Sequence, residues 1–370
     1  MIYFDAGATT LQKPERVRRA MYRAAAAMSS PGRGSYPATR LAEETDFRCR
    51  SLAAALFDVE DPACVVFTSS ATHGLNIAIK TLVKPGCRVV ISGYEHNAVT
   101  RPLHGIPDVE LTVIDAPLFR PESMLAEFEQ ALDAGADAVI CTHVSNVFGY
   151  RLPVEGIAAL CRRRGVPFVL DASQSAGMLP VSMRELGAAF IAMPGHKGLY
   201  GPQGTGLLLC GHEAQPLLEG GTGSQSLLQH MPQELPDHAE AGTQNVCGIC
   251  GLAAGLRFVR QQTPQRLLAH EIRLRRLLAS MLEDIPGIRL FTGEAQSGTL
   301  SLCAAQTDCE TLAARLASEG ICVRAGLHCA PLAHESAGTL ETGTVRFSLS
   351  AFNTEREILE IAKHIRSCLK

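Results

Sequence analysis

One lysine stands within a stretch rich in glycine, residues 195–206, and it is the side chain best suited to covalent chemistry. A lysine amine attacks a carbonyl only when uncharged, which requires a fixed position and surroundings that lower its pKa. The glycines around Lys197 permit tight turns and close backbone approach. Because most lysines are simply solvated, the prediction that Lys197 is catalytic depends on the other residues brought near it.

Polar residues at the ends of predicted strands form a second group of candidates. Residues 68–74 follow a strand and open a helix, where free N–H groups and the helix dipole favour a phosphate, although serine and threonine also cap helices routinely. Asp171 ends another strand, three residues before Gln174. A carboxylate there keeps a bound pyridine nitrogen protonated, or serves as a helix cap. His96 and residues 142–149 follow two further strands.

These candidates need a scaffold that brings several strand ends together. Strand-like and helix-like segments alternate between residues 64 and 192, which predicts an α/β fold with a parallel sheet covered by helices on both faces. Such sheets bind ligands at the carboxyl ends of their strands. The predicted strands are 64–68, 88–92, 110–114, 138–142, 168–171 and 189–192, and the predicted helices are 14–28, 40–56, 72–82, 97–104, 122–132 and 157–164.

The pattern changes near residue 255, which divides the chain into a large domain (1–255) and a small α+β domain (256–370). Residues 1–30 are expected to pack with the small domain. The elements predicted after the large domain are helices 252–262, 264–282, 309–318 and one from 354, and strands 287–291, 299–304, 321–323 and 344–350.

Composition excludes several classes of function. The chain has 46% hydrophobic and 19% charged residues and a net charge of -3, which gives no electrostatic reason to bind nucleic acid or an anionic membrane. No signal peptide or membrane span is expected, and thirteen cysteines without a repeating framework suggest reduced thiols in the cytoplasm. Cys247 and Cys250 have the spacing of half a zinc site, but no second ligand pair follows, so no metal is expected.

Taken together, the motifs resemble the cysteine desulfurases and selenocysteine lyases of the class V aminotransferase group, which use pyridoxal phosphate. The resemblance extends from residues 3–10, Tyr-Phe-Asp-Ala-Gly-Ala-Thr-Thr, to residues 346–354, Arg-Phe-Ser-Leu-Ser-Ala-Phe-Asn-Thr, with five motifs in the same order. It implies fold type I of the pyridoxal phosphate enzymes, in which the large domain holds a mostly parallel seven-stranded sheet.

The resemblance also implies a role for each candidate residue. Lys197 would form the Schiff base with the cofactor, and Asp171 would pair with the pyridine nitrogen. Gln174 would donate to the phenolate oxygen. His96, counted among the catalytic residues, would stack on the ring, and Asn146 would lie beside it.

The phosphate contacts implied by the resemblance come from Ala71, Thr72 and His196, with Thr243 supplied by the partner subunit. Each site would then need two chains, so a homodimer is expected. Pro194 stands where relatives usually carry a hydroxyl, and one hydrogen bond to the phosphate is therefore expected to be missing.

Two further residues imply the reaction. Arg346 would bind the substrate carboxylate as a bidentate pair, a geometry suited to a guanidinium. Cys329, in the sequence Arg-Ala-Gly-Leu-His-Cys-Ala-Pro, resembles the nucleophile of the second group of desulfurases. The expected reaction converts L-cysteine to L-alanine. Lys197 moves the α-proton, and the sulfur is left on Cys329 as a persulfide for an acceptor protein.

Other functions stay open at this point. A selenocysteine lyase would use the same residues on L-selenocysteine. In a pyridoxal phosphate β-lyase or aminotransferase, Cys329 would be incidental. A scaffold without cofactor that binds a sulfur-carrier protein is a further alternative, but it leaves the lysine, aspartate and glutamine at strand ends unexplained.

Overall fold

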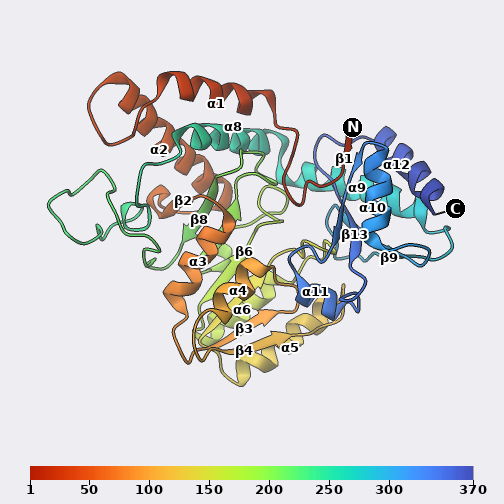
Figure 1. Ribbon diagram of the computed structural model, residues 1–370. Helices are drawn as coiled ribbons and strands as arrows, with labels where there is room; N and C mark the ends of the chain where they lie inside the picture. The colour runs from red at the N-terminus through yellow and green to blue at the C-terminus, as the bar shows by residue number, and fades with distance from the viewer. Residues whose placement is uncertain (370) are drawn as a thin grey trace.

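A seven-stranded sheet forms the centre of the computed structural model, which describes residues 1–369 (Figure 1). The strand order is β2-β8-β7-β6-β5-β3-β4, and β8 runs antiparallel to both of its neighbours while the other pairs are parallel. This confirms the predicted α/β class and the mostly parallel sheet. The strands are β2 (Val65–Thr68), β3 (Arg88–Ser92), β4 (Glu110–Ile114), β5 (Ala138–Thr142), β6 (Phe168–Asp171), β7 (Phe190–Pro194) and β8 (Gly206–Cys210).

Both faces of this sheet are covered, which explains why its central strands are apolar without alternation. One face packs against the buried side chains of α2 (Pro37–Phe57), α5 (Pro121–Asp133), α6 (Val154–Arg164), α7 (Met183–Leu186) and α8 (Val246–Gln262). The other face packs against α3 (Ala71–Leu82) and α4 (Asn97–His104). The carboxyl ends of β5, β6 and β7 therefore lie beside one another with their backbones held rigidly.

A second, antiparallel sheet has the strand order β12-β13-β10-β9 and forms a separate core. Its strands are β9 (Ile288–Phe291), β10 (Thr299–Ala304), β12 (Arg324–Gly326) and β13 (Thr344–Ser348). The helices of this part of the chain are α9 (Pro264–Leu282), α10 (Cys309–Ser318), α11 (Pro331–Ser336) and α12 (Glu355–Cys368). This combination of an antiparallel sheet with helices agrees with the predicted small α+β unit.

The N-terminal segment crosses between the two parts of the molecule. β1 (Ile2–Tyr3) pairs with β11 (Ile321–Cys322), and α1 (Glu15–Ala27) packs along α8 (Figure 1). Residues 2–5 thus lie against the C-terminal region and α1 lies against α8, while the packing of residues 1–30 as a whole with a small domain stays a prediction. α8 runs without a break through residue 255, and the division there stays a prediction.

The hydrophobic pattern of the sequence did not predict the short elements. β12, α7 and α11 have three, four and six residues, too few to show a hydrophobic period. α8 begins at Val246, six residues before the predicted start, because Gly248 and Gly251 weaken the helical signal. A methyl group at Gly251 would lie 2.7 Å from Met21 Cγ, so this glycine allows α1 to pack closely on α8.

Within residues 1–369, no helix combines the length and the apolar character needed to cross a bilayer. The same residues contain no cluster of three or more histidine, cysteine, aspartate or glutamate side chains arranged to hold a metal ion. Cys247 and Cys250 lie on α8 as half-buried free thiols.

Candidate active site

A cavity of about 220 Å³ lies at the carboxyl ends of β5, β6 and β7. Nine of the predicted site residues line it together, although they come from seven separate segments of the chain. They are Ala71, Thr72, His96, Asn146, Asp171, Gln174, His196, Lys197 and Arg346. The cavity is therefore the candidate active site.

Lys197 lies in a tight loop that follows β7. The Gly195 N–H donates to the Thr205 carbonyl (2.8 Å), and the Gly201 N–H donates to the Gly195 carbonyl (2.7 Å). A methyl group at Gly198 would lie 2.4 Å from the Ala176 carbonyl, so the glycine there permits a close approach of two backbones. Burial lowers the pKa of Lys197 to about 8, with the nearby Asp171 opposing that shift. The loop thus presents an amine that is readily uncharged near neutral pH.

Asp171 and His96 are fixed by backbone N–H groups on either side of the lysine. Asp171 is 2% exposed, and its Oδ1 accepts a hydrogen bond from the Ser173 N–H (2.8 Å). His96 Nδ1 accepts from the Ala98 N–H (3.0 Å) at the start of α4, which places any ring proton on Nε2. Burial lowers the pKa of His96 to about 4, so the ring is neutral.

The first turn of α3 opens onto the cavity at Ala71 and Thr72. Ser70 caps this helix by accepting from the His73 N–H (3.2 Å), and the dipole of the twelve-residue helix favours an anion at this end. Pro194, which also lines the cavity, offers neither a hydroxyl nor an N–H group. The loss of one hydrogen bond to a phosphate here stays a prediction.

His196 is attached to the N-terminal segment. Its carbonyl accepts hydrogen bonds from the Thr10 N–H and from Lys13 Nζ, both at 3.0 Å, and its ring Nδ1 lies 3.0 Å from the Thr9 hydroxyl. Gln174 Nε2 donates to the Gly7 carbonyl (3.0 Å). Residues 7–13 are therefore bound to residues that line the cavity, and Gly7 and Ala8 line it themselves.

Arg346 is wholly buried and already has partners. One guanidinium nitrogen donates to Asp5 Oδ1 (2.6 Å) and another to the Asn146 carbonyl (3.0 Å), while its Nε has no partner in the structure. Burial lowers the pKa of Arg346, and Asp5 opposes the shift. A substrate carboxylate must therefore share this guanidinium with Asp5 or displace it.

Cys329 lies on the loop between β12 and α11, and its side chain is exposed. Two contacts fix the loop: Asn146 Nδ2 donates to the His328 carbonyl (2.8 Å), and the Asn97 N–H donates to the Cys329 carbonyl (2.7 Å). Arg324, which lines the cavity, lies 3.5 Å from the Cys329 sulfur. The φ angles of 53° at His328 and 57° at Cys329 are left-handed, so these contacts hold the thiol in an unusual backbone conformation.

Cys329 is also the one exposed cysteine among the thirteen, all of which lie in the described residues 1–369. Arg324 places a positive charge beside this sulfur. The geometry therefore presents a single accessible sulfur nucleophile next to a residue of the lysine cavity.

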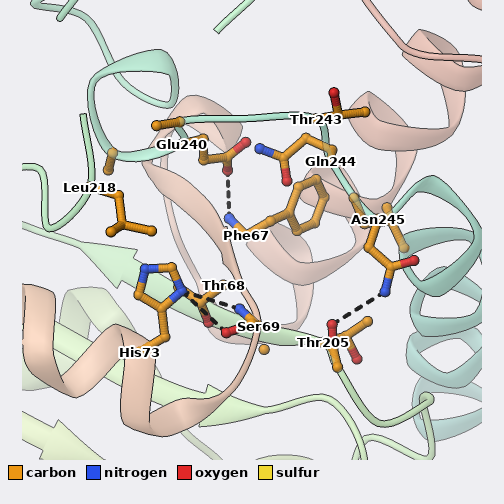
Figure 2. A pocket seen from close by; sticks show the side chains of 15 residues that line it. Phe67, Thr68, Ser69, His73, Thr205, Leu218, Glu240, Thr243, Gln244 and Asn245 are labelled. Carbon is orange, nitrogen blue, oxygen red and sulfur yellow. Dashed lines mark hydrogen bonds between the residues drawn. The ribbon is translucent and has the colours of Figure 1, made fainter. Parts of the chain in front are cut away.

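Thr243, like Cys329, is a predicted residue that does not line the lysine cavity. It lines a separate pocket with Thr68, His73 and Gln244 (Figure 2). Glu240 on the same pocket accepts from the Phe67 N–H and pairs with buried Arg50 (2.7 Å). A role for Thr243 as a residue given to another subunit stays a prediction.

Two contributors to the site were missed by the sequence reasoning as individual residues, Asp5 and Arg324. Both lie inside motifs that carried the resemblance, and Asp5 is a carboxylate in an otherwise apolar opening segment. That isolated charge was the available signal, since a buried acid generally has a cationic partner.

The residues around the cavity fit pyridoxal phosphate. An amine that is readily uncharged, a buried carboxylate with a free oxygen, a neutral imidazole and a helix N-terminus meet in one space. This donor set matches an aldehyde, a pyridinium, an aromatic face and a phosphate respectively. The polar groups therefore suit the cofactor implied by the resemblance.

Comparisons with known proteins agree with this geometry. The family model described as aminotransferase class V matches residues 2–361. A probable cysteine desulfurase of Mycolicibacterium paratuberculosis is 33% identical over 99% of this chain, which spans only 55% of that protein's length. A probable cysteine desulfurase of Methanothermobacter thermautotrophicus is 32% identical over 96% of this chain and 92% of its own length.

Among solved structures, the apo cysteine desulfurase of Thermococcus onnurineus NA1 superposes with a TM-score of 0.92 at 28% identity, covering 100% of this chain and 94% of that one. The mainly parallel sheet with its smaller C-terminal unit is thus the fold type I arrangement. The match of the family model over nearly the whole chain and these relatives lead to one conclusion: the chain belongs to the class V aminotransferase family, among enzymes related to the cysteine desulfurases.

Proposed function

We propose that this chain is a pyridoxal phosphate-dependent cysteine desulfurase that converts L-cysteine to L-alanine and keeps the sulfur on Cys329 as a persulfide. The observation that carries the proposal is the exposed Cys329 thiol, 3.5 Å from an arginine of the lysine cavity. An ordinary transaminase has no use for a nucleophile in this position. The names of the relatives support the same activity.

Each residue around the cavity would hold one part of the cofactor. Lys197 would bind the aldehyde carbon, Asp171 the ring nitrogen and Gln174 the phenolate oxygen, with His96 over the ring. The phosphate would lie at the first turn of α3. Bound there, pyridoxal phosphate supplies an electron-poor ring that stores the electrons released at the substrate Cα.

The chain's own groups account for the proton movements. The lowered pKa of Lys197 lets its Nζ accept a proton from the substrate Cα near neutral pH. Arg346, with Arg324 beside it, provides the positive charge that orients the substrate carboxylate. The buried walls exclude water from the reacting bonds.

Cys329 performs the sulfur transfer. Its thiolate attacks the substrate sulfur, an S–S bond forms, and the substrate Cβ–S bond breaks with its electron pair going to carbon, which then takes up a proton. The products are alanine and a persulfide in which the transferred sulfur is bonded to Cys329. The exposure of Cys329 then leaves that sulfur open to an acceptor protein.

The wider assignments follow from this proposal. Thr243 would reach the phosphate of a partner chain, since it lines a different pocket from Lys197 in its own chain, and the active form would be a homodimer. A cytoplasmic, reducing compartment suits an enzyme whose thirteen cysteines include an exposed nucleophile. The sulfur acceptor would be a protein.

The test compares alanine formation in a single turnover by purified enzyme reconstituted with pyridoxal phosphate, using L-cysteine and, separately, L-selenocysteine. Wild-type enzyme is expected to form alanine from L-cysteine and to carry a persulfide on Cys329. Lys197→Ala should form no alanine, and Cys329→Ala should form no persulfide. Cys322→Ala, which removes a half-buried thiol of the same region, is the matched control and should retain both.

Two results would contradict the proposal. Turnover of L-selenocysteine alone would replace it with a selenocysteine lyase. Unchanged sulfur release from Cys329→Ala would mean that Cys329 is incidental and that the enzyme is another β-lyase of the same family.

A further inference from the structure

Behind Lys197 lies a second, narrower cavity of about 40 Å³. Four residues, Gly7, Ser173, Gln174 and Lys197, line both this cavity and the candidate active site. Lys197 therefore borders both cavities. The substrate would reach Lys197 from the active-site cavity, so the second cavity needs a separate explanation.

Glu271 of α9 lines the second cavity and is 7% exposed. Within residues 1–369 its carboxyl group makes no hydrogen bond or ion pair. A methyl group at Gly298 would lie 2.6 Å from Glu271 Oε2, so a glycine at position 298 makes room for this side chain. An unpaired buried carboxyl of this kind calls for an explanation.

The surroundings of Glu271 favour its neutral form. Met178, Leu179, Leu268 and Leu349 form the apolar part of the wall. The titratable residues that line the cavity with Glu271 are Lys197 and Tyr200, while Arg275, one turn further along α9, is bound to Gln296 (2.7 Å).

Burial raises the pKa of Glu271 well above its ordinary value. Burial also raises the pKa of Tyr200, so the tyrosine is neutral too. Among residues 1–369, a charged carboxylate here would have no counter-charge and no hydrogen-bond donor, which is costly in an apolar site.

The cavity is also large enough for water. A space of about 10 to 15 Å³ of this kind holds one water molecule, and a polar wall is needed to retain it. Hydroxyl groups of Thr10, Ser297, Thr299 and Ser348 line the cavity in addition to the carboxyl group. One or a few bound waters therefore fit between Glu271 and the lysine loop.

We propose that Glu271 is a protonated acid that exchanges protons with Lys197 through water in this second cavity. This inference rests on the proposed function, because it supplies the solvent route by which Lys197 loses or regains the proton it moves at the substrate Cα. Glu271 does not touch the substrate. It acts through Lys197 by exchanging protons with that amine, so it is a positioning residue and not a catalytic one.

The exchange conserves protons and involves no redox change. The protonated Nζ of Lys197 gives a proton to the water, and the water gives one of its own to the carbonyl oxygen of the Glu271 carboxyl. The hydroxyl proton of that carboxyl then passes to solvent. One proton leaves and, in the reverse sequence, one enters.

The first test uses the cofactor-free protein and does not depend on activity. Its infrared spectrum near pH 7 should contain a protonated carboxylic acid band that Glu271→Gln removes, and Met178→Leu, an apolar wall variant of similar volume, should keep it. Glu271→Gln should also raise the melting temperature at about pH 7 and lose that gain toward about pH 4, where the acid is protonated in the unfolded chain as well. An ionised Glu271 in the wild-type spectrum would overturn the proposal even if the variant failed to fold.

The second test follows the proton itself. Turnover of L-cysteine in D₂O by the reconstituted enzyme should place deuterium almost completely at the alanine Cα, and Glu271→Gln should raise the protium retained there toward about one third, because the abstracted proton shares the Lys197 amine with two deuterons. Met178→Leu should leave the deuterium content unchanged. Equal deuterium in Glu271→Gln and wild type, with the infrared band present, would overturn the exchange role. Absence of alanine from wild-type enzyme would instead count against the proposed function and leave the infrared result standing.

Discussion

At Lys197, folding and catalysis make opposite demands on one amine. Folding favours leaving an ammonium in water, whereas reaction with an aldehyde requires the uncharged amine. The protein places the amine in a partly buried loop held by backbone contacts of its neighbours, and its pKa falls to about 8. Burial of this amine thus lowers the free energy of unfolding and leaves the residue ready to react.

This cost predicts the stability of the Lys197→Met variant in the cofactor-free protein. Because the folded-state pKa of about 8 lies below the ordinary value of 10.5, the unfolded chain binds the extra proton between these limits, and wild-type stability rises with pH across that window. Lys197→Met should therefore be more stable by about 2 kcal/mol near pH 7, with the gain vanishing above about pH 10.5. Urea unfolding at a series of pH values measures the difference.

The matched control is Lys80→Met, which changes an exposed lysine on α3. It should show no gain that depends on pH. A Lys197→Met variant with the same stability as wild type at every pH would mean that burial does not act on this amine.

Among the elements, α8 has a role that its sequence does not reveal. It packs along α1 and α2 and also supports the lysine loop from below the cavity. A methyl group at Gly255 would lie 2.3 Å from the Leu199 carbonyl, so the helix and the loop touch backbone to backbone. The position of Lys197 is thus determined partly by a helix sixty residues further along the chain.

We expect Gly255→Ala to destabilise the protein by about 1 to 3 kcal/mol and to slow turnover, because the backbone of the lysine loop has to move. Gly156→Ala on α6 is the control: its methyl group meets the flexible end of Leu125, which can turn away. Thermal unfolding and alanine formation measure both effects. Equal stability and equal turnover of the two variants would show that movement of the lysine loop affects neither quantity.

The elements that sequence could predict are those with a run of apolar or β-branched side chains. β3, β4 and β5 were predicted to the residue, because their runs of apolar and β-branched side chains are bounded by turn residues. Asp171 and His96 were found for a related reason, as polar residues at or shortly after the end of such runs, and Lys197 was found from the glycines around it. Local spacing was sufficient for each of them.

Contacts between distant segments left no such trace. The approach of Glu271 to the lysine loop depends on how α9 packs against the large domain. Glu271 sits in an otherwise ordinary amphipathic helix, where a glutamate is normally a solvated residue. Only the three-dimensional structure shows that it is buried.

At the scale of the whole molecule, Thr243 and Lys197 of one chain face different pockets. The proposed homodimer resolves this by pairing each lysine with the threonine of the other chain. A two-fold interface presents the same surfaces from both subunits, so two such sites form at once. Subunit mixing can test the arrangement.

Lys197→Ala and Thr243→Val subunits, each expected to be impaired alone, should regain activity when mixed, dissociated and reassembled. Random pairing makes half of the dimers hybrid, and one of the two sites in each hybrid is intact, so about a quarter of wild-type activity should return. Alanine formation after reassembly measures it, with unmixed samples treated alike. No recovery would mean that Thr243 acts on the lysine site of its own chain.

The ion pair between Asp5 and Arg346 joins residues 341 positions apart. During synthesis on a ribosome, the segment that carries Asp5 emerges long before the strand that carries its partner. The cavity, which Gly7, Ala8 and Arg346 of β13 line together, therefore cannot be complete until most of the chain has left the ribosome. Such distant contacts slow folding, and they also delay the appearance of reactive chemistry until the protein around it is finished.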